Sequence, residues 1–210
     1  MIETIFSTPL YLNFAEDQIL TGIQSEISSV IDNIKSKYVK DWGKTHKISS
    51  DDILEQYDLA NLENFIEHNV YEYLDDLQYQ GSREYKIRAW VSVFETNDYG
   101  HIHSHGEADI SGVYYFQTNI TDGELSFYHP VEQLELSPCF EQYDPIWKHV
   151  PMVGKLLMFP GYLKHGIFRN QTTDTRISIS FNIFFMEERD RRIEETNVRF
   201  NEEDETNSIP

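Results

Sequence analysis

The sequence has one cysteine, few basic residues and no long apolar run. Cys139 has no partner within the chain, so an internal disulfide is excluded. The 17 basic residues stand against 36 acidic ones, and the resulting net charge of −19 repels nucleic acids and anionic membranes. The sequence shows neither an apolar run of membrane-spanning length nor a basic-then-apolar leader. We therefore expect a soluble, cytoplasmic protein with no nucleic-acid or membrane partner.

At 210 residues the chain is long enough to bury a sizeable core. We expect a single domain over residues 1–186, with a helical part at about 13–80 and a β core at about 84–186. Residues 187–210 are strongly charged, which predicts a short helix followed by an acidic tail.

The first third of the chain has the pattern of helices. Apolar residues recur at helical spacing over residues 15–37, which predicts an amphipathic helix. Ser49 and Ser50 precede a second helix start, and the helical pattern continues over residues 62–77. Before these helices we expect one short edge strand within residues 3–12, broken by Pro9.

From residue 85 onwards the sequence is typical of short strands separated by Gly, Pro, Asn and Asp. The expected strands are residues 85–94, 112–117, 124–128, 155–159, 165–168 and 176–185. Many short strands after a helical start predict a sandwich or barrel with helices packed outside.

Two histidines separated by one residue, with a third far downstream, predict a mononuclear metal centre. In an extended segment the side chains of His103 and His105 point the same way, so they could hold one ion that His165 closes from a neighbouring strand. Glu107 and Asp109 follow closely and offer carboxylates to the same site.

Arg176 opens a segment in which polar and apolar residues alternate. This alternation predicts that one face of the strand carries Arg176, Ser178, Ser180 and Asn182. A buried arginine needs an anion, and a carboxylate suits its guanidinium best because the two can form a pair of parallel hydrogen bonds.

Five blocks of sequence occur in an order that resembles a known family. They are His-Ser-His at 103–105, Ser-Gly-Val-Tyr-Tyr at 111–115, Gly-Glu-Leu-Ser-Phe-Tyr-His-Pro at 123–130, a Gly-to-His segment at 154–165, and Arg-Ile-Ser-Ile-Ser-Phe-Asn at 176–182. Together they resemble the bacterial and phage branch of the 2-oxoglutarate- and Fe(II)-dependent oxygenases. The resemblance covers about residues 85–185. It leaves the helical third and the tail unidentified.

The resemblance implies a mainly β fold with N-terminal helices, whose core is a double-stranded β-helix, or jelly-roll. It implies Fe(II), 2-oxoglutarate and O2 as cofactor and co-substrates. By the same resemblance, Arg176 pairs with the distal carboxylate of 2-oxoglutarate, and Tyr115 and Ser178 hydrogen-bond that group. The expected catalytic residues are His103, His165 and Arg176.

The sequence does not decide which residue is the third metal ligand. The blocks of the family place His105 beside His103 and His165, but the wider superfamily has His-x-Asp or His-x-Glu. His105 with Glu107 satisfies that pattern literally, and Asp109 could also supply the carboxylate. We take His103, His105 and His165 as the expected metal ligands.

The implied reaction is hydroxylation of an unactivated C–H bond in a small molecule, or in a prolyl or other residue of a peptide, with release of succinate and CO2. A cupin-type metal-dependent dioxygenase or isomerase that does not use 2-oxoglutarate is the main alternative, and Arg176 disfavours it. A non-enzymatic jelly-roll binding protein is a third interpretation. The N-terminal helices are compatible with a homodimer.

Overall fold

The computed structural model describes residues 7–37, 40–49, 52–131 and 145–186 of the chain. The helices are α1 (Asp17–Ser36), α2 (Ile53–Gln56) and α3 (Ala60–Asp76). The strands are β1 (Tyr11–Phe14), β2 (Lys40–Trp42), β3 (His46–Ile48), β4 (Tyr85–Phe94), β5 (Gly100–His103), β6 (Ile110–Gln117), β7 (Leu125–Tyr128), β8 (Ile146–His149), β9 (Lys155–Pro160), β10 (His165–Ile167) and β11 (Arg176–Phe185).

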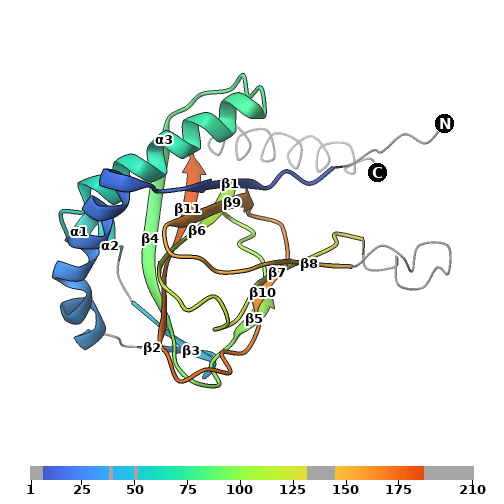
Figure 1. Cartoon of the computed structure of the whole chain (residues 1–210). Helices are drawn as coiled ribbons and strands as arrows, with labels where there is room; N and C mark the ends of the chain where they lie inside the picture. Colours follow the sequence, from blue (N-terminus) through green and yellow to red (C-terminus); the bar gives the residue numbers. More distant parts are fainter. Residues whose placement is uncertain (1–6, 38–39, 50–51, 132–144, 187–210) are drawn as a thin grey trace, which may run out of the picture.

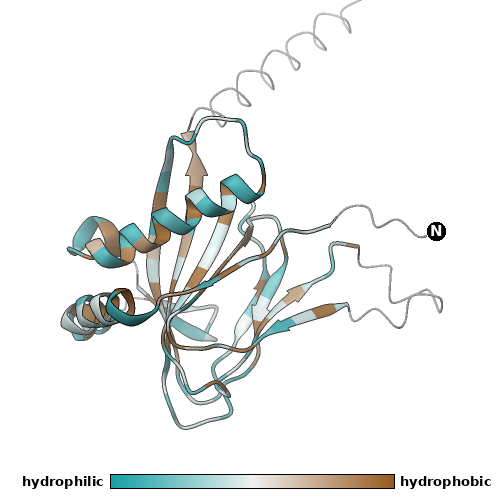
Figure 2. Ribbon diagram, turned by 45° about the horizontal axis from the view of Figure 1, so that its top comes forward, coloured by the Kyte–Doolittle hydropathy of each residue, from teal (hydrophilic) through white to brown (hydrophobic). Residues whose placement is uncertain are grey.

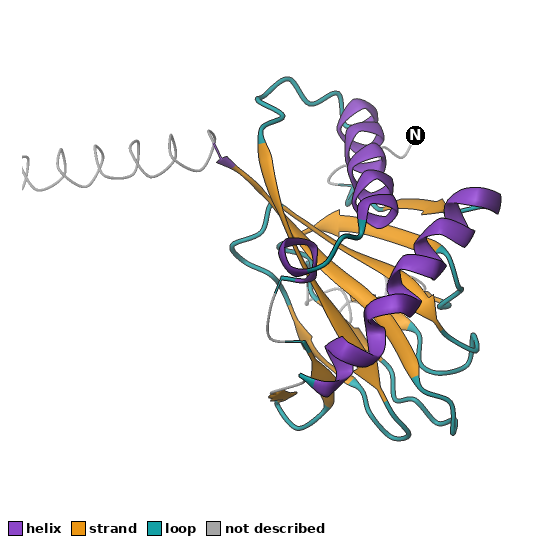
Figure 3. Ribbon diagram, turned by 90° about the vertical axis from the view of Figure 1, so that its left-hand side faces the viewer, coloured by secondary structure: helices purple, strands orange, loops and turns teal. Residues whose placement is uncertain are grey.

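These strands form two sheets, and every pair of neighbouring strands within them is antiparallel. The larger sheet has the order β1-β9-β6-β11-β4-β3-β2, and the smaller sheet has the order β5-β10-β7-β8. The helices cover one face of the larger sheet (Figure 3), and the smaller sheet lies on its other side (Figure 1). The mainly β fold with a jelly-roll core and helices outside is therefore confirmed.

The alternation along β11 sorts its side chains between two cores. Ile177, Ile179 and Ile183 are buried in the core between the larger sheet and the helices. On the neighbouring strand β6, Tyr114 belongs to that same core, whereas Tyr115 belongs to a second core between the two sheets. Successive residues of a strand point to opposite faces, so the polar positions of β11 lie on the face toward the smaller sheet.

The predicted first helix is present over nearly its full predicted length. Its buried residues, Ile23, Ile27, Ile31 and Ile34, repeat every three or four positions and form one apolar stripe. Hydrophobic and hydrophilic positions alternate along the helices in Figure 2, as expected for helices that bury one side. Each fully buried isoleucine contributes about 2 kcal/mol through the hydrophobic effect.

The first turn of α3 is capped by a side chain from α1. The N-cap residue, Leu59, has no side chain that could accept a hydrogen bond there. Instead the carboxylate of Glu26 accepts hydrogen bonds from the backbone N–H groups of Asn61, at 2.8 Å, and Leu62, at 3.2 Å. This contact satisfies two free N–H groups and places negative charge at the positive end of the helix.

Replacement of Glu26 by alanine is therefore expected to lower the free energy of unfolding by about 1–2 kcal/mol, the usual range for loss of a helix cap. Urea unfolding followed by circular dichroism measures this change. Glu16→Ala is the matched control, because Glu16 stands at the N-cap of α1 without a capping hydrogen bond. Equal destabilisation by the two variants would contradict the assigned role of Glu26.

Several predicted elements differ from the observed ones. Part of the edge strand expected at residues 3–12 lies outside the described residues. The described strand in this region is β1 at Tyr11–Phe14, which pairs with β9. The helix expected to start near residue 50 is broken at Tyr57, whose backbone is extended, into α2 and α3. Strands β2, β3, β5 and β8 were not predicted. Each has only three or four residues, which gives little periodic signal.

Within the residues that the structure describes, no helix is both long and apolar enough to span a bilayer. The charged helix and tail predicted at residues 187–210 lie outside the described residues. The division of the chain into one domain and a charged C-terminal segment stays a prediction.

Candidate metal centre

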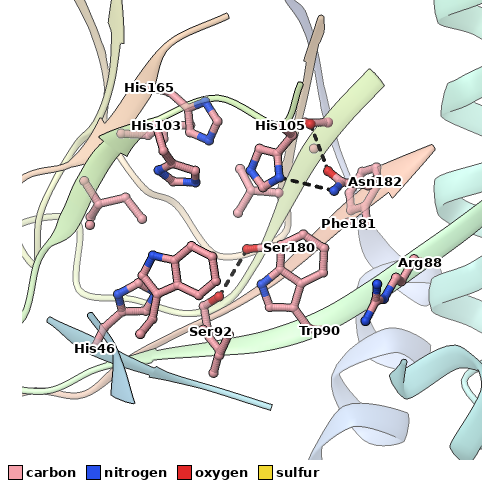
Figure 4. Close-up of a pocket in the computed structure, with 18 of the residues that line it drawn as sticks. His46, Arg88, Trp90, Ser92, His103, His105, His165, Ser180, Phe181 and Asn182 are labelled. Atoms are coloured by element: carbon pink, nitrogen blue, oxygen red, sulfur yellow. Dashed lines mark hydrogen bonds between the residues drawn. The ribbon is translucent and has the colours of Figure 1, made fainter. Parts of the chain in front are cut away.

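Three histidines from two adjacent strands and the turn that follows one of them converge between the sheets. His103 at the end of β5 lies directly opposite His165 at the start of β10. His105 lies just beyond β5, where its backbone N–H donates to the carbonyl of Gly161 at 2.8 Å. The ligand atoms of the three imidazoles all lie within 4.8 Å of one another (Figure 4). The structure thus brings together the three histidines that the sequence singled out.

The Nδ1 atoms of two of these histidines are hydrogen-bonded to backbone carbonyls. His103 Nδ1 donates to the carbonyl of His101 at 2.7 Å, and His165 Nδ1 donates to the carbonyl of Leu163 at 2.8 Å. A neutral imidazole that donates from Nδ1 has its lone pair on Nε2. Both side chains are therefore held in the tautomer that offers Nε2 to a metal.

Burial keeps two of the imidazoles neutral. Desolvation, reinforced by the neighbouring His103, lowers the pKa of His105 to about 4 and that of His165 to about 3. Only 5% of the surface of His165 is exposed. Because metals bind the neutral form of histidine, these side chains need not lose a proton to ligate an ion at neutral pH.

The two carboxylates considered from the sequence are not part of this cluster. In the described part of the chain, the group of metal-ligating side chains contains only His103, His105 and His165. The Asp109 carboxylate accepts the backbone N–H of Phe185 at 3.0 Å and so ties the end of β11. Glu107 is exposed in the turn after His105.

A second cluster, of hydrogen-bond donors, surrounds Arg176. This side chain is fully buried, and its guanidinium lies about equally far from the rings of Phe94, at 5.1 Å, and Tyr115, at 5.0 Å. Nη1 donates to the carbonyl of Gly123 at 2.6 Å, whereas Nε and Nη2 have no hydrogen-bond partner among the described residues. The same holds for the hydroxyls of Tyr115 and Ser178, which lie opposite each other on β6 and β11.

Gly123 contributes a backbone position that only glycine accommodates readily. Its φ is +108°, and a Cβ there would lie 2.2 Å from the carbonyl oxygen of Phe168. The resulting turn aims the Gly123 carbonyl at Arg176.

The donors around Arg176 form a site for an anion. A buried cation without an anion is strongly unfavourable, and buried hydroxyls without partners add to that cost. Burial raises the pKa of Tyr115, so its hydroxyl stays protonated and can donate. A carboxylate would satisfy Nε, Nη2 and both hydroxyls at once. Arg176 and the three histidines line one cavity of about 350 Å³, so an anion bound there would face the candidate metal site.

Other residues that line this cavity were not recognised from the sequence. Trp42 comes from the unpredicted β2–β3 hairpin, and its ring lies 6.2 Å from that of His103. His46, also on the hairpin, stacks on Phe94 at 4.3 Å and is not in the metal cluster. Arg88, on β4, lines the cavity as well. Only the alternation of β4 could have indicated that Arg88 shares a face with the site.

Comparison with protein-family models finds one match. Residues 88–182 match the family described as "Putative 2OG-Fe(II) oxygenase". This segment contains all three histidines and Arg176. Comparison with curated proteins finds no match.

Solved structures share the fold at low sequence identity. A prolyl-4-hydroxylase from Pseudomonas putida is 10% identical, with a TM-score of 0.61 over 86% of this chain and 94% of its own. HygX from Streptomyces hygroscopicus, solved with nickel and 2-oxoglutarate, is 12% identical, with a TM-score of 0.59 over 86% and 84%. A prolyl hydroxylase in complex with a hypoxia inducible factor peptide fragment, from Trichoplax adhaerens, is 14% identical, with a TM-score of 0.58 over 88% and 86%.

Proposed function

We propose a function on the premise that the core of this chain is that of the 2-oxoglutarate- and Fe(II)-dependent oxygenases. The chain is a dioxygenase of this class, and its reaction is hydroxylation of an unactivated C–H bond. His103, His105 and His165 hold Fe(II), and Arg176, Tyr115 and Ser178 hold the distal carboxylate of 2-oxoglutarate.

This proposal rests on one observation: the histidine cluster and Arg176 line the same cavity. Three imidazoles converge with their ligand atoms within 4.8 Å of one another, and Arg176 lines the same cavity with Nε and Nη2 available. Beside Arg176, the buried hydroxyls of Tyr115 and Ser178 also have no hydrogen-bond partner among the described residues. Three histidine ligands would hold Fe(II) and leave it open to a keto acid and O2. A dicarboxylate that carries a keto acid at one end satisfies both clusters with one molecule.

The residues of this chain position the reactants and exclude water. Arg176 neutralises the far carboxylate, while Tyr115 and Ser178 fix its orientation. When bound, iron and 2-oxoglutarate supply the oxidising chemistry: one atom of O2 enters the C–H bond and the other enters succinate, with release of CO2. The aromatic and aliphatic residues of the cavity wall, among them Phe159 and Leu125, keep bulk water from the reacting groups.

An anaerobic titration tests this proposal directly. Addition of 2-oxoglutarate to the Fe(II)-loaded protein should produce the weak visible charge-transfer band of an iron-chelated keto acid. A protein that binds Fe(II) without developing the band would exclude the oxygenase and favour the cupin-type alternative. A protein that binds neither would favour a non-enzymatic jelly-roll.

The substrate class is a further part of the proposal. The Trichoplax enzyme was solved with a peptide, and HygX was also solved with hygromycin B, so the shared fold accepts both kinds of molecule. We therefore keep a small molecule and a peptide, including a prolyl residue, as substrates. A homodimer and a cytoplasmic location are proposals that rest on the sequence alone.

Asn182 is proposed as the positioning residue for His105. The Ser111 hydroxyl donates to Asn182 Oδ1 at 2.8 Å, and Asn182 Nδ2 lies 3.2 Å from His105 Nδ1 (Figure 4). In this orientation His105 Nδ1 accepts, so the proton is on Nε2 and blocks ligation from that atom. A half-turn of the amide lets Oδ1 accept from His105 Nδ1–H while Nδ2 donates to Ser111. We assign this second orientation to the iron-bound protein.

Asn182→Leu removes both hydrogen bonds with little change of volume and is expected to weaken Fe(II) binding by about 10- to 100-fold, the usual effect of losing such a partner. Asn182→Asp should retain tight binding, because a carboxylate accepts from His105 Nδ1–H. Anaerobic calorimetry measures both affinities.

Ser180→Ala is the control for this series. Ser180 is on the same face of β11, but in the described part of the chain its hydroxyl is hydrogen-bonded to Ser92, at 3.2 Å, and not to His105. If Asn182→Leu binds Fe(II) as tightly as Ser180→Ala, Asn182 does not position the third ligand.

A further inference from the structure

The cavity has two arginines at opposite ends of one strand ladder. On β4 the side chains facing the cavity are Arg88, Trp90, Ser92 and Phe94. Their direct partners on β11 are Asn182, Ser180, Ser178 and Arg176, in that order. Asn182 contacts His105, so the proposed iron site adjoins the Arg88 end of this ladder.

Arg88 is an exposed residue of β4, and its charge acts on the Glu55 carboxylate without contacting it. Among the described residues it makes no hydrogen bond or ion pair within contact distance. The nearby carboxylate of Glu55 is instead bound by Lys86, at 2.9 Å. An unpaired guanidinium that lines a cavity is available to an anionic ligand.

The charge of the cavity is opposite to that of the chain. The protein has 36 acidic and 17 basic residues, yet no described residue of the cavity wall is Asp or Glu, and Arg88 and Arg176 are its two cationic side chains. Arg176 is assigned to 2-oxoglutarate. Because no carboxylate lines this wall, the face of Arg88 toward the cavity is available to a second anion.

Two indole rings lie beside the histidines, and Trp90 is the one next to Arg88 in the order of the residues of β4 that line the cavity. The ring of Trp42 lies 6.2 Å from that of His103, and the ring of Trp90 lies 5.8 Å from that of His105. Trp42 is 45% exposed, so this wall opens to solvent. In Figure 4, Arg88 lies beyond Trp90 on the side away from His103 and His165. Indoles provide flat apolar contact area for a carbon skeleton beside the site of oxidation.

We infer that the substrate is a small organic acid with an apolar or aromatic skeleton, whose anionic group Arg88 binds while the skeleton lies along Trp42 and Trp90. This inference rests on the proposed function. A cavity of about 350 Å³ that also receives 2-oxoglutarate leaves space for a molecule of amino-acid size. A carboxylate fits best, because the guanidinium binds it with two parallel hydrogen bonds.

Phenylacetate, phenyl phosphate and the neutral phenylacetamide are the probes that test this inference. Anaerobic calorimetry on the protein loaded with Fe(II) and 2-oxoglutarate should detect phenylacetate and at most much weaker binding of phenylacetamide. Arg88→Gln should weaken phenylacetate binding at least tenfold. Arg83→Gln, which removes an arginine that is paired with Asp75 and does not line the cavity, should leave it unchanged.

The outcomes separate this inference from the proposed function. The visible band of iron-chelated 2-oxoglutarate reports the proposed function, and it should be the same in wild type and Arg88→Gln. Tighter binding of phenyl phosphate than of phenylacetate, with the same loss in Arg88→Gln, would support the anion site and assign it to phosphate esters. Equal binding of phenylacetate and phenylacetamide, no binding of phenylacetate to the wild type, or an unchanged affinity in Arg88→Gln would overturn the inference.

Discussion

His165→Ala is expected to abolish stoichiometric Fe(II) binding, because the variant keeps only two of the three converging imidazoles. His165 is the most deeply buried of the three and lies directly opposite His103. Its ring is held by the Leu163 carbonyl and by contact with Phe159, at 4.7 Å between centroids. Metal analysis of the anaerobically loaded and desalted proteins measures the effect.

His46→Ala is the matched control for this experiment. His46 lines the same cavity and burial lowers its pKa to about 4, but it is not in the metal cluster. This variant should retain one Fe(II) per chain. Equal iron content in His165→Ala and His46→Ala would refute the proposed metal centre.

The same measurement identifies the third ligand. We expect His105→Ala to lose iron, whereas Glu107→Ala and Asp109→Ala keep it. Asp109→Ala should instead show reduced stability, because the Asp109 carboxylate holds the backbone of Phe185. Iron loss in Glu107→Ala or Asp109→Ala, with retention of iron in His105→Ala, would show that the third ligand is a carboxylate and not His105.

Arg176→Ala is expected to weaken 2-oxoglutarate binding by roughly 100-fold or more while leaving Fe(II) binding intact. Removal of one partner of a buried charged pair costs on the order of 3–5 kcal/mol, and each 1.4 kcal/mol corresponds to a tenfold change in affinity. The loss also leaves Tyr115 and Ser178 without the cation that fixes the carboxylate between them. Calorimetry on the Fe(II)-loaded protein gives both affinities.

Arg176→Lys is the companion variant, and it should recover only part of the lost affinity. Lysine restores the charge but not the two parallel hydrogen bonds. Circular dichroism before titration shows whether each variant is folded, since Arg176 is fully buried and also bonds Gly123. If Arg176→Ala binds 2-oxoglutarate as tightly as the wild type, Arg176 is not the anion site of an oxygenase, and the cupin-type alternative is favoured.

The sequence by itself determined which residues share a face. The spacing of Ile23, Ile27 and Ile31 fixes α1 because a 3.6-residue period has one apolar side. The alternation from residue 176 to residue 182 likewise predicts β11 with its polar side correctly placed. The His-Ser-His block, together with the downstream blocks, indicated the histidines that the fold brings together.

Only the tertiary structure decided what lies opposite each of these faces. The contact of Asn182 with His105 joins residues 77 positions apart, and it depends on the pairing of β11 with β6. The hairpin that brings Trp42 to the cavity is too short to have a readable pattern. Periodicity reports the direction of a side chain within its own element. Its partner is set by strand register and by the packing of two sheets, which no local pattern contains.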